Sequence, residues 1–196
     1  MACKVGMVSL GCPKNQMDAE LMLAKLKQAG YTLTAEAGLA DVVIVNTCGF
    51  IEDAKKESIE QILEFAQLKK EGRIRRIIVT GCLAERYQKE LADELPECDG
   101  VLGLGGNGDI VQAVETVVEG APVVRFPDKG CWPLDGDRVQ TTPEFFAYLR
   151  VGDGCSNRCA YCAIPSIRGP LRSREMDALV QEARGLAASG VKELVL

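Results

Sequence analysis

The stretch DVVIVNTCGF, residues 41–50, decides the fold class of this chain. Its first half is a run of β-branched apolar residues, which is typical of a strand buried on both faces of a sheet. A helical pattern follows over residues 52–70, and a second run of the same kind, RIIVT, covers residues 76–80. Strand, helix and strand in this order predict a parallel β-α-β unit.

The same alternation extends in both directions from this unit. Upstream, residues 4–10 have strand character, and an amphipathic helical pattern covers residues 15–29. The elements predicted downstream are a helix over residues 84–94, a short strand over 99–103 and a helix over 109–119. We therefore predict an α/β fold with a doubly wound parallel sheet of the Rossmann or flavodoxin type.

The composition changes over residues 127–143, where Pro, Gly and Asp surround Trp132, and this change predicts a linker. After it, the pattern predicts a strand over residues 145–151, a loop, a helix over 176–189 and a strand over 191–196. A complete β/α barrel needs about 250 residues, so we expect only its first part here and a chain that is a fragment of a longer protein. The expected division is 1–126 for the first domain, 127–143 for the linker and 144–196 for the partial barrel.

The bulk composition limits the class of protein. The chain has 196 residues, 47% of them hydrophobic, and a formal net charge of −5, so it can bury a core and has no general attraction to DNA or to a membrane. Nine cysteines, an odd number without a secretion signal, indicate free thiols in a reducing, cytoplasmic setting. The apolar residues 5–12 predict a strand rather than a leader, and no run is long enough to span a membrane.

The chain contains no histidine, which excludes several kinds of site. It has no imidazole ligand for a metal, no Ser-His or Cys-His nucleophile pair and no histidine base. A transition metal must therefore be held by cysteine or carboxylate, and nine thiols favour soft-metal chemistry.

One group of cysteines is distinguished by its spacing. Residues 155–162, CSNRCAYC, place Cys155, Cys159 and Cys162 in a C-x3-C-x2-C pattern, which we call the triad. Three thiolates this close can bind one soft metal centre, but structural zinc sites and complete iron–sulfur sites normally use four protein ligands. Three ligands leave one position open, which indicates chemistry rather than structural support.

A second group, the strand-end set, consists of Cys12, Cys48 and Cys82, each of which follows a predicted strand. Ligands of open parallel sheets bind at the carboxyl ends of the strands, so we predict a shared metal site there. Helix N-termini nearby are expected to lower the pKa values of these thiols. A glycine beside each cysteine should allow a sharp turn, and these residues are Gly11, Gly49 and Gly81. The alternative is that the three are ordinary buried cysteines that do not converge.

The remaining thiols and one glycine-rich run predict no site. Cys3, Cys98 and Cys131 have no partner at matching spacing, so we interpret them as structural or incidental. Residues 103–108, GLGGNG, match a dinucleotide-binding pattern, but they follow the last strand of the unit rather than the first. This run therefore predicts a turn.

The sequence does not decide between two roles for each of three arginines and one tyrosine near the triad. Arg168, Arg172 and Arg174 follow the triad and could contact a ligand or partner, or could lie on a solvated loop. Tyr161 directly precedes the third cysteine and could shield a cluster or pack on a flat ring.

Taken together, the two cysteine groups resemble the radical S-adenosylmethionine methylthiotransferases. The triad with Tyr161, C-x3-C-x-Y-C, resembles the signature of the radical S-adenosylmethionine superfamily. The runs GCPKN, NTCGFI and TGCL, which contain the strand-end set, are similar to the N-terminal domain of the methylthiotransferases. Within that family, GCPKN, NTCGFI and IPSIRGP look most like the RimO-type branch.

The resemblance implies cofactors and their ligands. It implies a [4Fe–4S] cluster on the triad, with S-adenosylmethionine bound at the open iron, and an auxiliary [4Fe–4S] cluster on the strand-end set. Tyr161 would lie beside the cosubstrate or the first cluster. The resemblance assigns no catalytic side chain within this chain.

The resemblance also implies an activity and partners. RimO-type enzymes methylthiolate the β-carbon of an aspartate in a small-subunit ribosomal protein, and a reductant protein of the flavodoxin or ferredoxin type would serve them; neither DNA nor a membrane is expected as a partner. A sulfur of the auxiliary cluster would accept a methyl group, and a radical made at the triad would activate the substrate carbon. Two alternatives are a tRNA-adenosine methylthiotransferase with the same clusters and a non-catalytic iron–sulfur carrier or electron-transfer module. A flavodoxin-like binding domain is disfavoured, because GCPKN lacks the hydroxyl-rich character of a phosphate-binding turn.

Overall fold

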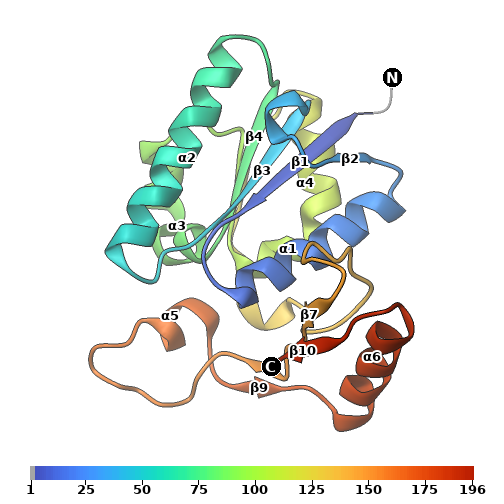
Figure 1. Ribbon diagram of the computed structural model, residues 1–196. Coiled ribbons are helices and arrows are strands. Elements are labelled where there is room, and N and C mark those ends of the chain that lie inside the picture. The colour runs from blue at the N-terminus through green and yellow to red at the C-terminus, as the bar shows by residue number, and fades with distance from the viewer. Residues whose placement is uncertain (1–2) are drawn as a thin grey trace.

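The large parallel sheet has six strands, four of which the sequence predicts, and β1 to β4 are labelled in Figure 1. In the computed structural model, which describes residues 3–196, their order is β2-β1-β3-β4-β5-β6. This is the flavodoxin-like order with one further strand at the edge. The strands are β1 (Lys4–Ser9), β2 (Thr32–Thr34), β3 (Val42–Thr47), β4 (Arg76–Gly81), β5 (Gly100–Leu102) and β6 (Val123–Arg125).

Helices cover both faces of this sheet. On one face lie α1 (Pro13–Gln28) and α4 (Ile110–Val118), and on the other α2 (Glu52–Lys70) and α3 (Cys82–Glu94). Successive residues of β3 alternate between the two cores, with Ile44 packed on the α1–α4 side and Val45 on the α2–α3 side. The β-branched run is thus buried on both faces, as the sequence predicts.

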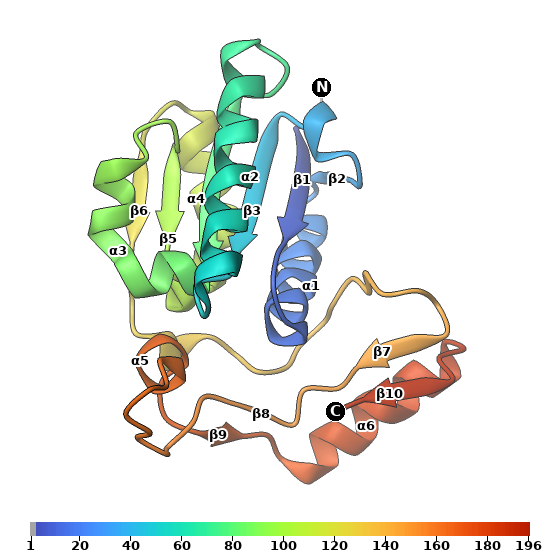
Figure 2. The ribbon, with the colours of Figure 1, turned by 60° about the vertical axis from the view of Figure 1, so that its left-hand side comes forward.

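The chain from β7 onward forms a second, smaller region toward which the strands of the large sheet point (Figure 2). Its strand β7 (Phe146–Tyr148) pairs in parallel with β10 (Glu193–Val195), and α6 (Met176–Ala188) precedes β10. The short strands β8 (Gly152–Asp153) and β9 (Arg172–Ser173) pair antiparallel, with α5 (Ile164–Arg168) between them in sequence. The predicted strand, loop, helix and strand are therefore present.

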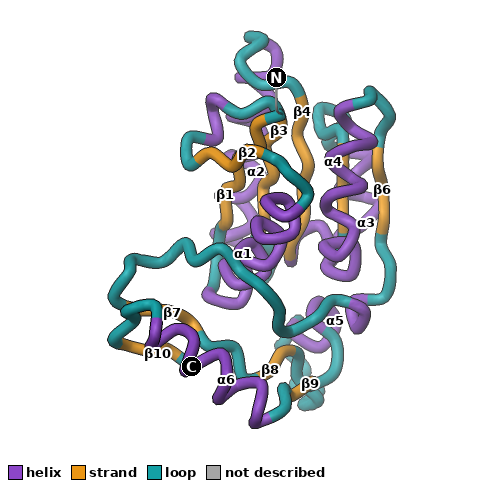
Figure 3. The backbone as a smooth tube through the Cα atoms, turned by 90° about the vertical axis from the view of Figure 1, so that its right-hand side faces the viewer, coloured by secondary structure: helices purple, strands orange, loops and turns teal. Residues whose placement is uncertain are grey.

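The connection from β6 to β7 runs beside α1 (Figure 3). Trp132 in this connection is 2% exposed and joins the core on the α1–α4 side of the sheet. The backbone N–H of Val139 donates to the carbonyl oxygen of Glu20 (3.1 Å), and that of Thr141 donates to the Glu20 carboxylate (2.8 Å). Residues 127–143 are therefore a packed connection, and the domain boundaries placed around them stay a prediction.

The elements absent from the sequence prediction are the shortest ones. Strands β2, β6, β8 and β9 each have two or three residues, too few for a periodic pattern, and α5 has five. Helix α1 begins two residues before its predicted start because Pro13 is suited to the first helical turn. Among residues 3–196, no helix is long and apolar enough to cross a membrane.

Candidate metal centres

Three strand ends carry the strand-end set to one edge of the large sheet. Cys12 immediately precedes α1, Cys48 directly follows β3, and Cys82 is the first residue of α3, directly after β4. Strands β1, β3 and β4 are neighbours in the sheet, so their loops leave the same edge side by side. The structure thus brings the three cysteine loops together.

Two glycines allow these loops to touch. A Cβ atom on Gly11, whose φ is +92°, would lie 2.6 Å from the Cβ and 2.9 Å from the Sγ of Cys48. A Cβ atom on Gly49 would lie 2.7 Å from the Cα of Leu83, the residue after Cys82. A side chain at either position would push the loops apart. Gly11 therefore permits both a turn and a close approach, whereas Gly49 is required only for close approach.

Asn15, fully buried in the first turn of α1, binds all three loops. Its amide nitrogen donates to the carbonyl oxygens of Leu10 (3.0 Å) and Thr47 (2.7 Å), which lie just before the first two cysteines of the set. Its amide oxygen accepts a hydrogen bond from the thiol of Cys82 (3.3 Å). One side chain therefore fixes the spacing of the loops.

Ser58 of α2 fastens the loop of Cys48. The backbone N–H of Cys48 donates to the Ser58 hydroxyl (3.0 Å), which also lies 3.0 Å from the Cys48 carbonyl oxygen. Both residues are buried. The position of Cys48 is thus set by the packed fold itself.

Burial dominates the electrostatics of Cys82. It raises the pKa of this thiol to about 11; the Arg168 guanidinium lowers that pKa in part, and the charges of Asp18 and Cys12 raise it further. The expectation that a helix N-terminus lowers the thiol pKa is therefore wrong for Cys82, because desolvation of a thiolate outweighs the favourable charges around it. A metal that binds here must displace the thiol proton.

A buried ion-pair network lies behind this edge. Asp18 of α1 pairs with Arg150 at 2.6 Å and with Arg168 at 3.0 Å, and it accepts a hydrogen bond from the indole of Trp132 (2.8 Å). Burial alone would raise the pKa of Asp18, but the two arginines outweigh it and hold that pKa below its ordinary value. Asp153 also pairs with Arg168, at 2.9 Å. The network joins α1 to the second region.

The triad occupies the loop between β8 and α5. Its cysteines line an open pocket of about 530 Å³, and the other lining residues are Ser156, Arg158, Pro165, Ser166 and Pro170. The backbone N–H of Cys155 donates to the carbonyl oxygen of Gly169 (3.0 Å), and that of Cys162 donates to Cys159 (3.0 Å). Cys159 is exposed, and the other two are half-buried. The loop therefore presents its thiols to an open space.

Tyr161 lies at the most exposed part of the same loop. Its side chain is 92% exposed, and it is not one of the residues that line the pocket of the triad. Its role beside a cofactor stays a prediction.

Neither set forms a site for a single metal ion. Across residues 3–196, no three Cys, Asp or Glu side chains converge on one point that an ion could occupy. Zinc requires such convergence, because its bonds to sulfur are about 2.3 Å long. In an iron–sulfur cluster each thiolate binds a different iron, so the sulfurs stand further apart. Three soft thiols at each of two places therefore fit multi-iron clusters better than single ions.

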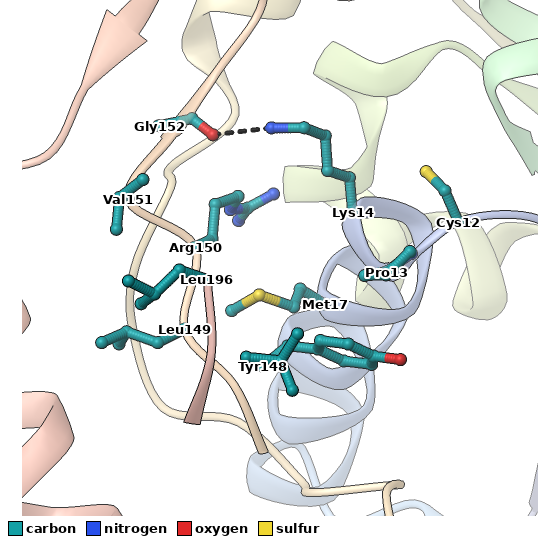
Figure 4. Close-up of a pocket in the computed structure, with 11 residues that line it drawn as sticks. Cys12, Pro13, Lys14, Met17, Tyr148, Leu149, Arg150, Val151, Gly152 and Leu196 are labelled. Atoms are coloured by element: carbon teal, nitrogen blue, oxygen red, sulfur yellow. Dashed lines mark hydrogen bonds between the residues drawn. The ribbon is translucent and has the colours of Figure 1, made fainter. Parts of the chain in front are cut away.

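A second cavity, of about 270 Å³, separates the start of α1 from the chain that leads to the triad (Figure 4). Cys12 and Met17 line it on the α1 side, and Tyr148 lines it on the side of β7. Across it, the ammonium of Lys14 donates to the carbonyl oxygen of Gly152 (2.8 Å). Cys12 is thus the member of the strand-end set that lines a space shared with the second region.

The glycine-rich run forms a tight turn, a short 3-10 helix over Leu104–Asp109. The carboxylate of Glu85 lies at its start, where it accepts a hydrogen bond from the backbone N–H of Leu104 (2.9 Å) and pairs with Lys129 (3.0 Å). A carboxylate already accepts the backbone N–H at the start of this turn, which disfavours a phosphate there, and the run forms the turn that the sequence predicts.

The three remaining thiols lie apart from both sets in the sequence. Cys3 and Cys98 are half-buried, and Cys131 is exposed. Burial raises the pKa of Cys98 to about 12, which makes it a poor nucleophile at neutral pH. Their interpretation as structural or incidental thiols stays a prediction.

The three arginines after the triad make their contacts within the chain. Arg172 donates to the carbonyl oxygen of Trp132 (2.9 Å), and Arg174 pairs with Glu182 at 2.6 Å while its own side chain is 2% exposed. Arg168 is buried in the network described above. The solvated-loop interpretation is therefore wrong for Arg168 and Arg174, because both side chains are buried and carboxylates within the chain pair with them.

Several residues of these sites were not singled out by sequence reasoning. Asn15 stands inside GCPKN, the run chosen for its cysteine, and Asp18 stands one turn further along the same helix. An acidic residue between the apolar Met17 and Leu21 is a signal that could have been noticed, since it puts a charge next to buried positions. Arg150, at the end of a predicted strand, carried no comparable signal.

Comparison with known proteins gives a family. Residues 4–103, about half of the chain, match the family described as "Uncharacterized protein family UPF0004". Two relatives are similar to this chain over its length. They are the proteins named "Ribosomal protein uS12 methylthiotransferase RimO" from Pelotomaculum thermopropionicum (strain DSM 13744 / JCM 10971 / SI), 52% identical to this chain, and from Thermoanaerobacter sp. (strain X514), 49% identical to it. These matches cover 100% and 98% of this chain. The chain spans 44% of the length of each relative.

A solved structure shares the fold. The radical S-adenosylmethionine methyltransferase TsrM from Kitasatospora setae, with tryptophan substrate and a cosubstrate analogue bound, matches 98% of this chain and 47% of its own, with a TM-score of 0.63 and 16% identity. A second structure of TsrM, with cobalamin and a [4Fe–4S] cluster, matches with a TM-score of 0.60 at 14% identity. At these identities the likeness concerns the fold alone, and it extends through both regions of the chain.

Proposed function

Because this chain belongs to the UPF0004 family, we propose that it carries the two cluster sites of a radical S-adenosylmethionine methylthiotransferase. The proposed reaction is methylthiolation of the β-carbon of an aspartate in a small-subunit ribosomal protein. The names of the relatives support this substrate, since they are called uS12 methylthiotransferases. The tRNA-adenosine alternative and the non-catalytic carrier have no comparable support.

The observation that carries the proposal is the presence of two separate groups of three thiols, one at the sheet edge and one around an open pocket. Cys12, Cys48 and Cys82 would hold an auxiliary [4Fe–4S] cluster, and Cys155, Cys159 and Cys162 would hold the second. Three protein ligands leave one iron of each cluster free for a group that is not protein. The iron–sulfur carrier alternative does not explain two such open sites.

The residues of the sheet edge would position the auxiliary cluster. Asn15 keeps the three loops at a fixed spacing, and Ser58 holds the loop of Cys48. The two glycines at the edge leave no side chain between the loops. The protein's contribution here is therefore orientation of the thiolates.

The residues of the triad would hold the second cluster at the surface of the second region. When bound there, that cluster supplies the electron for reductive cleavage of S-adenosylmethionine. The open pocket of the triad leaves room for the methionine part of the cosubstrate, and Tyr161 is proposed to close over it. The cavity lined by Cys12 lies between the start of α1 and residues 148–152, which lead to the triad loop, and would admit an apolar group beside the auxiliary site.

The proposal includes partners, a location and a division of the chain. A reductant protein of the flavodoxin or ferredoxin type would supply electrons, and free thiols with labile clusters suit the cytoplasm. Residues 1–126 would act as the auxiliary-cluster domain and 144–196 as the first part of the radical domain, connected by residues 127–143.

Anaerobic reconstitution with iron and sulfide tests the two-cluster proposal. Changing all three triad cysteines to Ala should remove about half of the bound iron, since each cluster holds four irons. Changing all three strand-end cysteines to Ala should remove the other half. A matched control with Cys3, Cys98 and Cys131 changed to Ala should retain all of it. Loss of all iron, or of none, in either cysteine-set variant contradicts two independent sites.

The substrate is tested separately with the active protein, a reductant and S-adenosylmethionine. We expect mass spectrometry to detect a methylthio group on the aspartate of a ribosomal-protein peptide and none on tRNA. The reverse result would assign the protein to the tRNA-directed branch.

A further inference from the structure

Arg168 links the segment that carries the triad, residues 155–168, to the strand-end set. Among the described residues, it is the one of this segment whose side chain donates a hydrogen bond to a thiol of that set. It ends α5, six residues after the last cysteine of the triad. Its side chain is only 2% exposed and reaches across to the edge of the large sheet. A buried guanidinium in such a place must have all its charge and donors satisfied within the protein.

Four groups surround the guanidinium. It donates to the amide oxygen of Asn15 at 2.6 Å and to the carboxylate of Asp153 at 2.9 Å, and it pairs with Asp18 at 3.0 Å. The fourth contact is an N–H group 3.5 Å from the sulfur of Cys82, a normal length for a hydrogen bond to sulfur. Arg168 therefore contacts a proposed cluster ligand directly and again through Asn15.

The charges of the buried network are paired without Cys82. Arg150 and Arg168 face Asp18 and Asp153, and all four side chains are at most 4% exposed. Lys14 also pairs with Asp153, but its side chain is 46% exposed and remains solvated. The hydrogen bond from Arg168 to the sulfur of Cys82 is therefore an additional contact, which the ion pairs do not require.

We propose that Arg168 is a positioning residue that couples the two cysteine sets, because it is carried by the triad's segment and donates a hydrogen bond to the sulfur of Cys82. This inference rests on the proposed function, since it concerns the cluster held by the strand-end set. Hydrogen bonds to ligand sulfurs and nearby positive charge stabilise the more reduced state of a cluster. Arg168 therefore raises the reduction potential of the auxiliary cluster and ties its surroundings to the position of the triad loop.

The test uses the protein with its triad cysteines changed to Ala, so that only the auxiliary cluster assembles. Iron content and the midpoint potential, followed by electron paramagnetic resonance, are compared with Arg168 present and in Arg168→Gln and Arg168→Lys. Glutamine removes the charge, and we expect the potential to fall. Lysine keeps the charge but not the planar fork, and we expect the potential to recover in part.

Arg150→Gln provides the matched control. Arg150 pairs with the same Asp18 at 2.6 Å and donates to the carbonyl oxygen of Leu134 at 3.1 Å, but none of its hydrogen bonds or ion pairs involves a cysteine. This variant disturbs the same network, and we expect its auxiliary potential to stay unchanged. If Arg168→Gln loses the cluster while Arg150→Gln retains it, that result also supports the coupling, because Arg168 contacts Cys82 and Asn15 and Arg150 contacts neither.

Two results overturn the inference. An unchanged potential in Arg168→Gln shows that the hydrogen bond to Cys82 has no influence, and equal shifts in both glutamine variants show a general effect of the network. A failure of the proposed function has a different signature, because the protein with Arg168 intact then binds no iron at the strand-end set. That outcome overturns the inference as well.

Discussion

The two cysteine sets each contain three thiols, and the molecule holds these thiols in opposite ways. The strand-end set stands on the ends of three paired strands, and Asn15 and Ser58 bind the loops that carry it. The triad stands on a single loop, in which two of its three backbone N–H groups make hydrogen bonds and Cys159 is exposed. One site is organised by the fold, and the other by a short local sequence.

For the proposed clusters, this difference indicates two ways of building a site. At the sheet edge, the packing of the large domain already orders the thiols, so binding of the proposed auxiliary cluster need not order the loops. In the triad loop, few internal contacts hold the thiols, so binding of the proposed second cluster is expected to do more of the ordering. A loop with so few contacts can adjust its shape, which suits the proposed entry and release of S-adenosylmethionine.

The largest effect is expected where the two regions join. Asp18→Asn removes the shared carboxylate and leaves Arg150 and Arg168 buried with less compensation, which should lower the free energy of unfolding by about 3–5 kcal/mol. Urea denaturation followed by circular dichroism measures this. Asp137→Asn, at an exposed carboxylate that only accepts a bond from Gln28, is the control and should change little. Equal losses in both variants would show that the buried network does not join the regions.

The next effect concerns the edge itself. Asn15→Leu leaves the carbonyl oxygens of Leu10 and Thr47 without their donor, which should cost about 2–4 kcal/mol of unfolding free energy. Iron binding at the strand-end set should fall, while iron binding at the triad stays. Gln16→Ala, which loses only a bond to Thr141, is the neighbouring control. Full iron at the edge in Asn15→Leu contradicts the view that the fold preorganises this site.

Hydrogen exchange compares the two sites directly. Loading the clusters should slow exchange of the amides in residues 155–163 by about tenfold or more, the factor that corresponds to about 1.4 kcal/mol of local stabilisation. The amides of β3 and β4, which are already protected, should change far less. Mass spectrometry of peptides from loaded and iron-free protein provides the measurement. An equal gain in protection at both sites would contradict the view that the sheet edge is ordered by the fold and the triad loop is not.

The smallest effect is expected at the exposed tip of the triad loop. Tyr161→Ala should change the unfolding free energy by less than about 0.5 kcal/mol, because its ring has almost no packing to lose. Tyr148→Ala is the contrast, since its ring makes an edge contact with Phe146 and it lines the cavity beside Cys12. A large loss of stability in Tyr161→Ala would mean that the loop is as firmly packed as the edge.

The regular parts of the molecule could be predicted from the sequence because their signals are local. The β-branched runs at residues 42–45 and 77–79 announce strands buried on both faces, and the cysteines that follow strands can be placed on one edge by topology alone. The triad needed only its spacing. These inferences depend on neighbouring residues and on one general rule for parallel sheets.

The contacts between the regions could not be predicted because they join distant polar residues. Asp18 and Arg168 are 150 positions apart, and both residue types usually lie on the surface. The same holds for Trp132, which the composition places in a linker and the structure places in a core. A segment rich in Pro, Gly and Asp indicates irregular backbone, but it does not indicate whether that backbone is packed.

The indole of Trp132 has a practical consequence. It is the only tryptophan of the chain, and it lies in the core with its N–H bonded to Asp18, at the junction of the two regions. Its fluorescence therefore has a single source. Emission at short wavelength reports that the indole is buried and that residues 127–143 are packed on α1. A shift to longer wavelength reports that water has reached the indole. The fluorescence of this one tryptophan thus reports whether the two regions of the molecule are packed together.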